Sequence, residues 1–370
     1  MSKPRARDLG IPFKGRTGPL NAITDVEGVK VGFTTLTDPS RNMRTGVTAI
    51  IPRGDEAGMP TPVWAGQFDL NGNGEMTGTH WINDAGYFIG PICITDTHGV
   101  GACHSGATKW MIEHYADFFD KEHAWAMPVV AETYSGVLND INAMFVEPRH
   151  AIEALNAAKD GPVEEGSVGG GNGMISYEYK GGTGTASRVV ELAGTSYTVA
   201  ALVQANHGIR PWLTIAGKEL WPEFDDHLLL SKEQGSIIVI IATDAPVTPL
   251  QLRQFAKRAA IGIGRAGTPG GNNSGDIFLA FSTANRAECM PQLDAPVLTM
   301  THINNERLDP FYHATVESVN EAVINALVAG EDVPTFKPAG LVVKAIDIEK
   351  LREVFADTAE TTPMPCRRQM

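Results

Sequence analysis

The most constraining feature of the sequence is an unbroken apolar run that begins directly after a glycine–serine pair. Residues 236–243 read Ser-Ile-Ile-Val-Ile-Ile-Ala-Thr and are rich in β-branched side chains, which favour a buried strand. The residues before Gly235 are polar and are typical of a loop. We therefore expect Ser236 to be the first residue of a buried strand.

This position of Ser236 suggests that the chain cuts itself before the serine. The glycine at 235 would permit the strained backbone that attack of the hydroxyl on its own preceding carbonyl requires. After the cut, Ser236 would carry a free α-amine with a pKa of about 7.7 to 8.0, which can act as the general base for its hydroxyl. Most Gly-Ser pairs before a strand are ordinary turn residues. Features elsewhere in the chain must therefore distinguish self-cleavage from an ordinary turn.

Length, charge and cysteine content narrow the class of protein. The 370 residues suffice for one large domain or two, and the formal charge of −13 disfavours nucleic acid as a partner and favours a small or cationic substrate. No run of about 18 apolar residues indicates a membrane span. No apolar signal segment follows the basic N-terminus, and the four scattered cysteines fit reduced thiols, so we expect a cytoplasmic protein.

Local patterns predict strands and helices that alternate irregularly. Because several strands follow one another as hairpins, we expect a layered α/β sandwich with largely antiparallel strands. Residues 208–235 form the only candidate linker and are interpreted as a flexible segment that leads to the cut. The pattern predicts a hairpin over 21–33, further strands at 46–52, 127–133, 175–179, 197–206 and 276–282, and helices at 105–114, 148–159, from Thr248 to 263, and 315–329.

Polar residues at the ends of apolar strands are the candidates for a site. The amide of Asn206 could donate to a developing oxyanion, although a turn at the strand end is equally compatible. Glu132 could bind a substrate ammonium, with Tyr134 close by, although solvated strand-end carboxylates are commoner. Ser274 and Asp276 would point the same way in extended backbone and could form a relay to a nucleophile; an Asx-type turn is the alternative.

Three other motifs say less about a functional site. Residues 71–79 contain too many glycines for a helix or strand, and so polar a loop often lines a site. The histidines and cysteine between 96 and 104 lack the spacing of a metal site. Residues 262–267 match GxGxxG but follow a helix, so they do not indicate dinucleotide binding. We expect no metal or cofactor.

Taken together, these segments resemble the family of β-peptidyl aminopeptidases and L-aminopeptidase D-Ala-esterase/amidases, which are self-processing N-terminal-nucleophile hydrolases. The similarity covers nearly the whole chain, and its specificity comes from the order of the motifs. They lie at residues 21–26, 70–75, 132–134, 168–171, 204–208, 235–239, 242–246 and 274–276.

The resemblance implies a fold and a mode of maturation. Cleavage between Gly235 and Ser236 would give an α chain of residues 1–235 and a β chain of residues 236–370. Both would stay in a single αββα layered domain spanning residues 1–370, an architecture shared with N-terminal-nucleophile hydrolases and ornithine acetyltransferases. The resemblance also implies a homotetramer of αβ pairs.

The resemblance also implies roles for individual residues. Ser236 matches the family's nucleophile, Asn206 its oxyanion-hole asparagine and Glu132 the acidic residue that recognises the substrate's free amino terminus. Tyr134 would lie near the reacting centre.

Two further residues match the serine and the acidic residue that support the nucleophile and its amine. These are Ser274 and Asp276; some family members have the longer Glu in place of Asp276.

The expected activity is hydrolysis of the N-terminal residue of a short peptide, amide or ester through an acyl-enzyme. One alternative is a self-processing acyltransferase of ornithine-acetyltransferase type, although that family usually has a threonine nucleophile. Another is a non-catalytic binding protein in which Ser236 merely begins a strand. The sequence leaves open whether the preferred first residue is an L-α, D-α or β-amino acid.

Overall fold

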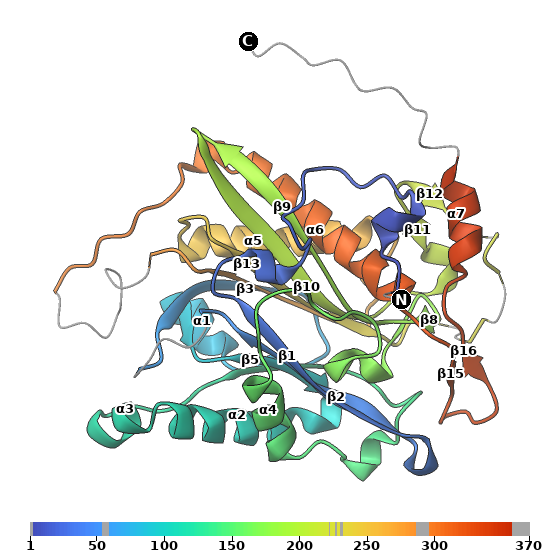
Figure 1. Ribbon diagram of the computed structural model, residues 1–370, viewed down its shortest axis with the longest axis horizontal. Helices are drawn as coiled ribbons and strands as arrows, with labels where there is room; N and C mark the ends of the chain where they lie inside the picture. Colours follow the sequence, from blue (N-terminus) through green and yellow to red (C-terminus); the bar gives the residue numbers. More distant parts are fainter. Residues whose placement is uncertain are drawn as a thin grey trace, which may run out of the picture.

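The computed structural model describes residues 3–53, 59–221, 223–225, 228–229, 232–285 and 296–356. These residues form two stacked sheets between two layers of helices (Figure 1). The four-stranded sheet has the order β1-β2-β5-β6, and the six-stranded sheet has the order β4-β3-β14-β13-β10-β9. Pairs β5/β6 and β13/β14 are parallel, and the other pairs in the two sheets are antiparallel.

The strands of the four-stranded sheet are β1 (Lys30–Asp38), β2 (Met43–Ile51), β5 (Ile92–Asp96) and β6 (Val129–Thr133). Those of the six-stranded sheet are β3 (Pro62–Gly72), β4 (Tyr87–Ile89), β9 (Gly182–Leu192), β10 (Thr195–Asn206), β13 (Ser236–Thr243) and β14 (Gly275–Ser282). Short two-stranded sheets are made by β7 (Ile175–Ser176) with β8 (Tyr179–Lys180), β11 (Thr214–Ile215) with β12 (Lys218–Glu219), and β15 (Val333–Pro334) with β16 (Val342–Val343).

Helices cover the outer face of each sheet (Figure 1). Helices α5 (Pro249–Gly264) and α6 (Asp309–Val328) pack on the six-stranded sheet, whereas α2 (Val100–His114) and α4 (Pro148–Asn156) pack on the four-stranded sheet. The remaining α-helices are α1 (Thr79–Ala85), α3 (Ala116–Lys121) and α7 (Ile348–Ala356).

The apolar run after Gly235 is continuous because β13 is buried on both faces. Successive side chains of a strand point to opposite sides. Ile237 and Val239 pack in the core under α5 and α6, whereas Ile238 and Ile240 pack in the core between the two sheets. The prediction of a buried strand that begins at Ser236 is therefore confirmed.

The strongest local signals also predicted helix α5 correctly. Thr248 accepts a hydrogen bond from the backbone nitrogen of Gln251, whose side chain accepts one from the nitrogen of Thr248, and Pro249 occupies the first turn. This reciprocal cap satisfies donors that the first helical turn leaves free. The apolar residues of one helix face, Leu252, Phe255, Ala259 and Ile263, are buried.

The predicted hairpin over 21–33 is wrong. The Asp25 carboxylate accepts hydrogen bonds from the backbone nitrogens of Leu20 and Ala22 and from the hydroxyl of Ser187, and residues Ile23–Asp25 form a 3-10 turn. Strand β1 pairs with β2 instead. A carboxylate that binds local backbone donors offers the chain an alternative to the strand ladder.

The predicted strand at 175–179 is also wrong, because a tight turn interrupts it. Tyr177 and Glu178 have φ values of 50° and 60°, so the chain reverses between β7 and β8. The sequence pattern gave no indication of β9, in which Gly, Thr and Ser interrupt the apolar side chains, yet β9 pairs with β10 along its length.

The first part of the candidate linker is packed and not flexible. Arg210 is buried and donates hydrogen bonds to the carbonyl oxygens of Tyr177, Phe224 and Glu178 at 2.9, 3.0 and 3.1 Å. Strands β11 and β12 follow directly. Residues 222, 226–227 and 230–231 of the segment lie outside the described residues.

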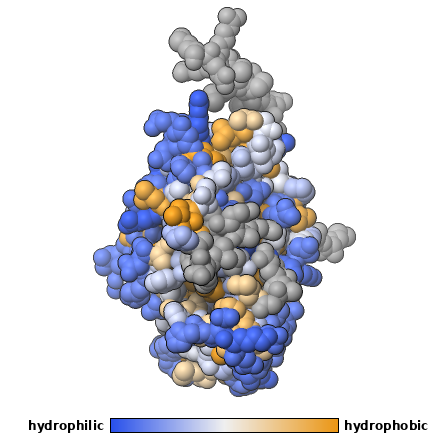
Figure 2. Space-filling model, turned by 90° about the vertical axis from the view of Figure 1, so that its left-hand side faces the viewer, coloured by the Kyte–Doolittle hydropathy of each residue, from blue (hydrophilic) through white to orange (hydrophobic). Residues whose placement is uncertain are grey.

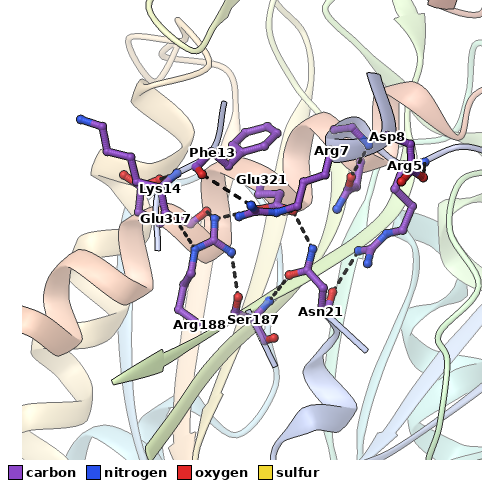
Figure 3. A network of polar contacts seen from close by, with 12 residues as sticks. Arg5, Arg7, Asp8, Phe13, Lys14, Asn21, Ser187, Arg188, Glu317 and Glu321 are labelled. Atoms are coloured by element: carbon purple, nitrogen blue, oxygen red, sulfur yellow. Dashed lines mark hydrogen bonds and ion pairs between the residues drawn. The ribbon is translucent and has the colours of Figure 1, made fainter. Parts of the chain in front are cut away.

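A polar network attaches the N-terminal segment to the six-stranded sheet (Figure 3). Glu321 of α6 binds Arg188 of β9 at 2.6 Å, Arg7 at 2.8 Å and the side-chain amide of Asn21 at 2.6 Å. Although burial opposes it, the hydrogen bond from Arg7 and the charge of Arg188 hold the pKa of Glu321 below its usual value. Three donors thus compensate one buried carboxylate.

Within the described residues, no helix combines the length and apolar character that a membrane span requires. On the face shown in Figure 2, apolar side chains form small separate groups on a largely hydrophilic surface.

Candidate active site

Ser236 lies at one end of the six-stranded sheet and opens onto a pocket of about 590 Å³. It is the first residue of β13 and pairs with Asn206 of β10 on one side and with Gly275 of β14 on the other. Its side chain is held in a nearly closed environment, since only 5% of the residue is exposed. The pocket is lined by Asn73, Gly74, Glu75, Thr97, Glu132, Tyr134, Lys232, Gln234, Gly235, Ser236 and Asn273.

The Ser236 hydroxyl has no hydrogen-bond partner among the described residues. Residue 235 has to be glycine for a different reason from the one that the sequence suggested. Its φ lies outside the left-handed region, but a Cβ there would overlap the carbonyl oxygen of Asn206. The close approach of two chain segments, and not a glycine-only backbone conformation, therefore requires Gly235.

Asn206 lies directly opposite Ser236 in the antiparallel pair β10/β13, so the two side chains lie on the same face of the sheet. Its Oδ1 accepts a hydrogen bond from the backbone nitrogen of Ile175 at 2.8 Å. Its Nδ2 donates to the carbonyl oxygen of Tyr134 at 3.0 Å. These contacts fix the amide, and no hydrogen bond between described residues uses its second N–H.

Tyr134 also lines the pocket, and its side chain is 45% exposed. The ring lies over Gly136, where a Cβ would overlap the tyrosine hydroxyl. Gly136 therefore allows the ring to lie close to the backbone at the edge of the pocket.

Ser274 and Asp276 point the same way, as their two-residue spacing predicts. The Ser274 hydroxyl donates to Oδ1 of Asp276 at 2.5 Å, and the side chain of Asn71 donates to Oδ2 at 3.3 Å. Burial, together with the charge of Glu233, raises the pKa of Asp276 to about 6 against the opposing hydrogen bonds from Ser274 and Asn71. The carboxyl group thus titrates closer to neutral pH than an ordinary aspartate does.

The pairing of β13 with β14 places this Ser-Asp pair relative to the nucleophile. Asp276 is paired with Ile237, so its side chain emerges on the face of the sheet opposite to that of Ser236. No hydrogen bond joins the pair to the Ser236 hydroxyl within the described part of the chain. The backbone nitrogen of Ser236 lies at the strand end between the two faces.

Glu132 occupies the opposite wall of the pocket, at the end of β6. It is buried, and its carboxylate accepts hydrogen bonds from the hydroxyl of Thr97 and, at 3.1 Å, from the backbone nitrogen of Glu75. Burial raises the pKa of Glu132, and these two hydrogen bonds act in the opposite direction. A cation that entered the pocket would favour the ionised form.

Comparison with known proteins identifies the family. The sequence model of peptidase family S58 matches residues 21–339. The chain belongs to peptidase family S58. The chain is 47% identical over 350 residues to the β-peptidyl aminopeptidase BapA of Sphingosinicella microcystinivorans, covering 89% of this chain and 86% of BapA. It is 42% identical over 351 residues to BapA of Sphingosinicella xenopeptidilytica, covering 90% and 86% of the two chains.

Solved structures of S58-like aminopeptidases superpose over nearly the whole chain. The L-aminopeptidase D-Ala-esterase/amidase of Ochrobactrum anthropi, described as a variant of the Ntn hydrolase fold, has a TM-score of 0.91 and 55% identity, covering 96% of this chain and 99% of that one. The β-aminopeptidase of a Burkholderia species has a TM-score of 0.88 and 42% identity, covering 97% and 100%. The expected fold, and the expected class of an N-terminal-nucleophile aminopeptidase, amidase or esterase, are thereby confirmed.

Sequence reasoning identified part of the S58 pocket. The glycine-rich loop was expected to line a site, and Asn73, Gly74 and Glu75 do line the pocket, although Asn71 and Gly72 end strand β3. Thr97 was considered only as part of a possible metal motif. Within the described residues, no three His, Cys, Asp or Glu side chains form a group that could hold a metal ion.

Glu233 was missed altogether. In the sequence it is one polar residue in a polar segment, and no local pattern distinguishes it from its neighbours Lys232 and Gln234, which are exposed. In the structure it is buried.

Proposed function

We propose that this S58 enzyme matures by cutting its own chain between Gly235 and Ser236 and then removes the N-terminal residue of short peptides, amides or esters. The observation that carries the proposal is the position of Ser236. It is the buried first residue of a central strand, its hydroxyl is free of hydrogen-bond partners among the described residues, and it faces a pocket shared with Glu132.

In the maturation step, the Ser236 hydroxyl attacks the carbonyl carbon of Gly235. The Oγ–C bond forms, the C–N bond breaks with transfer of a proton to the nitrogen, and an ester results. Water then hydrolyses this ester and leaves a carboxylate on Gly235 and a free amine on Ser236. Strand pairing with Asn206 and Gly275 holds Ser236 in place throughout.

In the catalytic cycle, the Ser236 amine accepts the hydroxyl proton as Oγ attacks the substrate carbonyl. The free N–H of Asn206 stabilises the oxyanion. The proton then passes to the leaving amine or alkoxide. Water, activated by the same amine, attacks the acyl-enzyme ester and releases the acyl group. Ser274 and Asp276 are proposed to hold the amine, because Asp276 is a buried acceptor beside the end of β13.

Glu132 is proposed to bind the ammonium group of the substrate, which confines the enzyme to free amino termini. Glu132→Gln should raise KM for an unblocked aminoacyl p-nitroanilide by about 10- to 100-fold, since a hydrogen bond to a charged group contributes about 1.5 to 3 kcal/mol. Steady-state kinetics with Ala and Gly p-nitroanilides would measure this change in KM. Glu75→Gln, which changes an exposed carboxylate at the same pocket, is the matched control. Equal turnover of N-acetylated substrates by the wild type would contradict the role of Glu132.

The pH profile should rise in the neutral range. Below a pH of about 7.7 to 8.0 the Ser236 amine is protonated and cannot accept the hydroxyl proton. Below about 6 Asp276 also becomes protonated, since burial raises its pKa to that value. The kcat of fully cut enzyme should therefore fall as the pH falls from 8 to 5. A flat profile from about pH 5 to 9 would contradict the amine as the base.

The choice of first residue is proposed to favour small unblocked amino acids. The named relatives divide between β-peptidyl aminopeptidases and an L-aminopeptidase D-Ala-esterase/amidase. A panel containing L-Ala, D-Ala, Gly and β-alanine p-nitroanilides would separate these activities. Transfer of the acyl group to an added amine in place of water would instead favour the acyltransferase alternative.

We further propose that the mature protein is a cytoplasmic homotetramer of αβ pairs. The resemblance to the family supports the tetramer, and Cys93 and Cys103 are buried free thiols, as a reducing compartment favours. Light scattering on purified, cut protein would test the assembly.

A further inference from the structure

A second buried carboxylate lies three residues before the proposed cut. Glu233 is 6% exposed, and its Oε1 accepts a hydrogen bond from the backbone nitrogen of Gly208 at 2.6 Å. None of the ion pairs between described residues includes Glu233. Burying a carboxylate without a cation costs free energy that only its hydrogen bonds can offset.

The contact joins the two chain segments that form the candidate cleavage site. Ser236 is paired with Asn206, and Gly235 lies against the carbonyl of Asn206. Glu233 then reaches Gly208, so residues 233–236 run back along residues 208–206. Gly208 is itself fixed, because its φ is +85° and a Cβ there would meet the ring of Tyr177 at 2.5 Å.

Glu233 anchors the segment directly before Gly235. Its neighbours Lys232 and Gln234 are both exposed, whereas Glu233 is buried. With the Gly208 hydrogen bond in place, the tripeptide 233–235 is held at both ends. Without the Glu233 carboxylate, which also lies against Gly271, the segment would lose its restraint at residue 233.

We propose that Glu233 is a positioning residue for self-cleavage: by binding the Gly208 amide it keeps the Gly235 carbonyl beside the Ser236 hydroxyl. This inference rests on the proposed cut at Gly235–Ser236. Attack requires the reacting atoms to lie about 3 to 3.5 Å apart and in line, and a misplacement of about 1 Å can cost about 100-fold in rate. Holding the segment before the bond supplies that alignment.

The contact requires an acceptor oxygen more than a charge. Burial raises the pKa of Glu233, although the hydrogen bond from Gly208 opposes the shift, and nearby Asp276 is a second buried carboxylate. Both the neutral and the ionised form keep an oxygen that can accept from Gly208. Glutamine keeps such an oxygen at the same reach, whereas alanine does not.

The experiment follows cutting of the full chain in a cell-free translation reaction by denaturing electrophoresis. We expect Glu233→Ala to convert the 39.7 kDa chain to fragments at least about tenfold more slowly than the wild type, and Glu233→Gln to stay within about threefold of it. Glu219→Ala, an exposed carboxylate on β12 of the same segment, is the matched control and should cut normally. Sequencing the N-terminus of the smaller fragment checks that the cut stays before Ser236.

A second comparison separates positioning from loss of the fold. Both Ser236→Ala and Glu233→Ala/Ser236→Ala should stay uncut, so their melting temperatures report the fold alone; we expect them to agree within about 4 °C. Cutting of Glu233→Ala at the wild-type rate would overturn the inference. So would a folded Glu233→Gln that cuts as slowly as Glu233→Ala, because acceptance of the Gly208 hydrogen bond would then not be what matters.

The failure of the proposed function would look different. If Ser236→Ala is still cut at the same bond, Ser236 is not the maturation nucleophile, whatever Glu233 does. If Ser236→Ala stays whole while Glu233→Ala cuts normally, the proposed function stands and only the role of Glu233 is lost.

Discussion

Replacing Ser236 with alanine should leave one band of 39.7 kDa where the wild type gives two fragments, and should abolish hydrolysis. The variant lacks the oxygen that attacks Gly235 and therefore also never exposes the amine that serves as base. We expect kcat/KM for an aminoacyl p-nitroanilide to fall by at least about 10⁴-fold, because nucleophile and base are lost together. Denaturing electrophoresis and a chromogenic assay on the same preparation measure both effects.

A matched control for this variant is Ser282→Ala. Ser282 is another buried serine, on the neighbouring strand β14, and its hydroxyl donates to the carbonyl oxygen of Ala245 at 2.7 Å. Its loss should cost about 1 kcal/mol of stability and leave cutting intact. A single uncut band from wild-type protein that is fully active would refute self-cleavage, as would normal activity in Ser236→Ala.

Removing the amide donor of Asn206 should have the next largest effect. We expect Asn206→Ala to lower kcat by about 100- to 1,000-fold, corresponding to about 2.7 to 4 kcal/mol for one oxyanion donor. A loss of kcat of this size is expected because Ile175 and Tyr134 hold the amide on the same face as Ser236. The rate should be divided by the fraction of cut chains, because slow maturation would otherwise be counted as slow catalysis.

Asn206→Asp keeps the structural contact with Ile175 but removes both N–H donors, including the one that binds the Tyr134 carbonyl. Aspartate keeps an oxygen that can accept from the Ile175 nitrogen but provides no N–H for an oxyanion. We therefore expect Asn206→Asp to be about as slow as Asn206→Ala while KM changes little. A variant within about threefold of the wild-type kcat would show that the oxyanion is stabilised by another group.

Several parts of the fold followed from interactions between residues close in sequence. The strand at 236–243 was predicted from its run of β-branched side chains, and helix α5 from the Thr248-Pro249 pair at its start. The orientation of Ser274 towards Asp276 followed from the two-residue period of a strand. In each case the deciding contact spans only a few residues.

Other parts were decided by distant contacts that no local pattern records. In place of the hairpin expected over 21–33, β1 pairs with β2 and Asp25 also binds the distant Ser187, and strand β9 forms because β10 provides a partner along its whole length. A strand rich in Gly, Thr and Ser depends on its neighbours for stability more than on its own propensity. These pairings cost chain entropy that only the complete fold offsets.

For the candidate site, the sequence by itself determined the residue types and their places at strand ends, together with the Gly235–Ser236 junction. Only the tertiary structure decided that Asn206 lies opposite Ser236, that Gly235 is required by the nearby Asn206 carbonyl, and that Glu233 is buried. The physical reason is that strand register fixes which side chains share a face, and register is set by pairing between segments far apart in the chain.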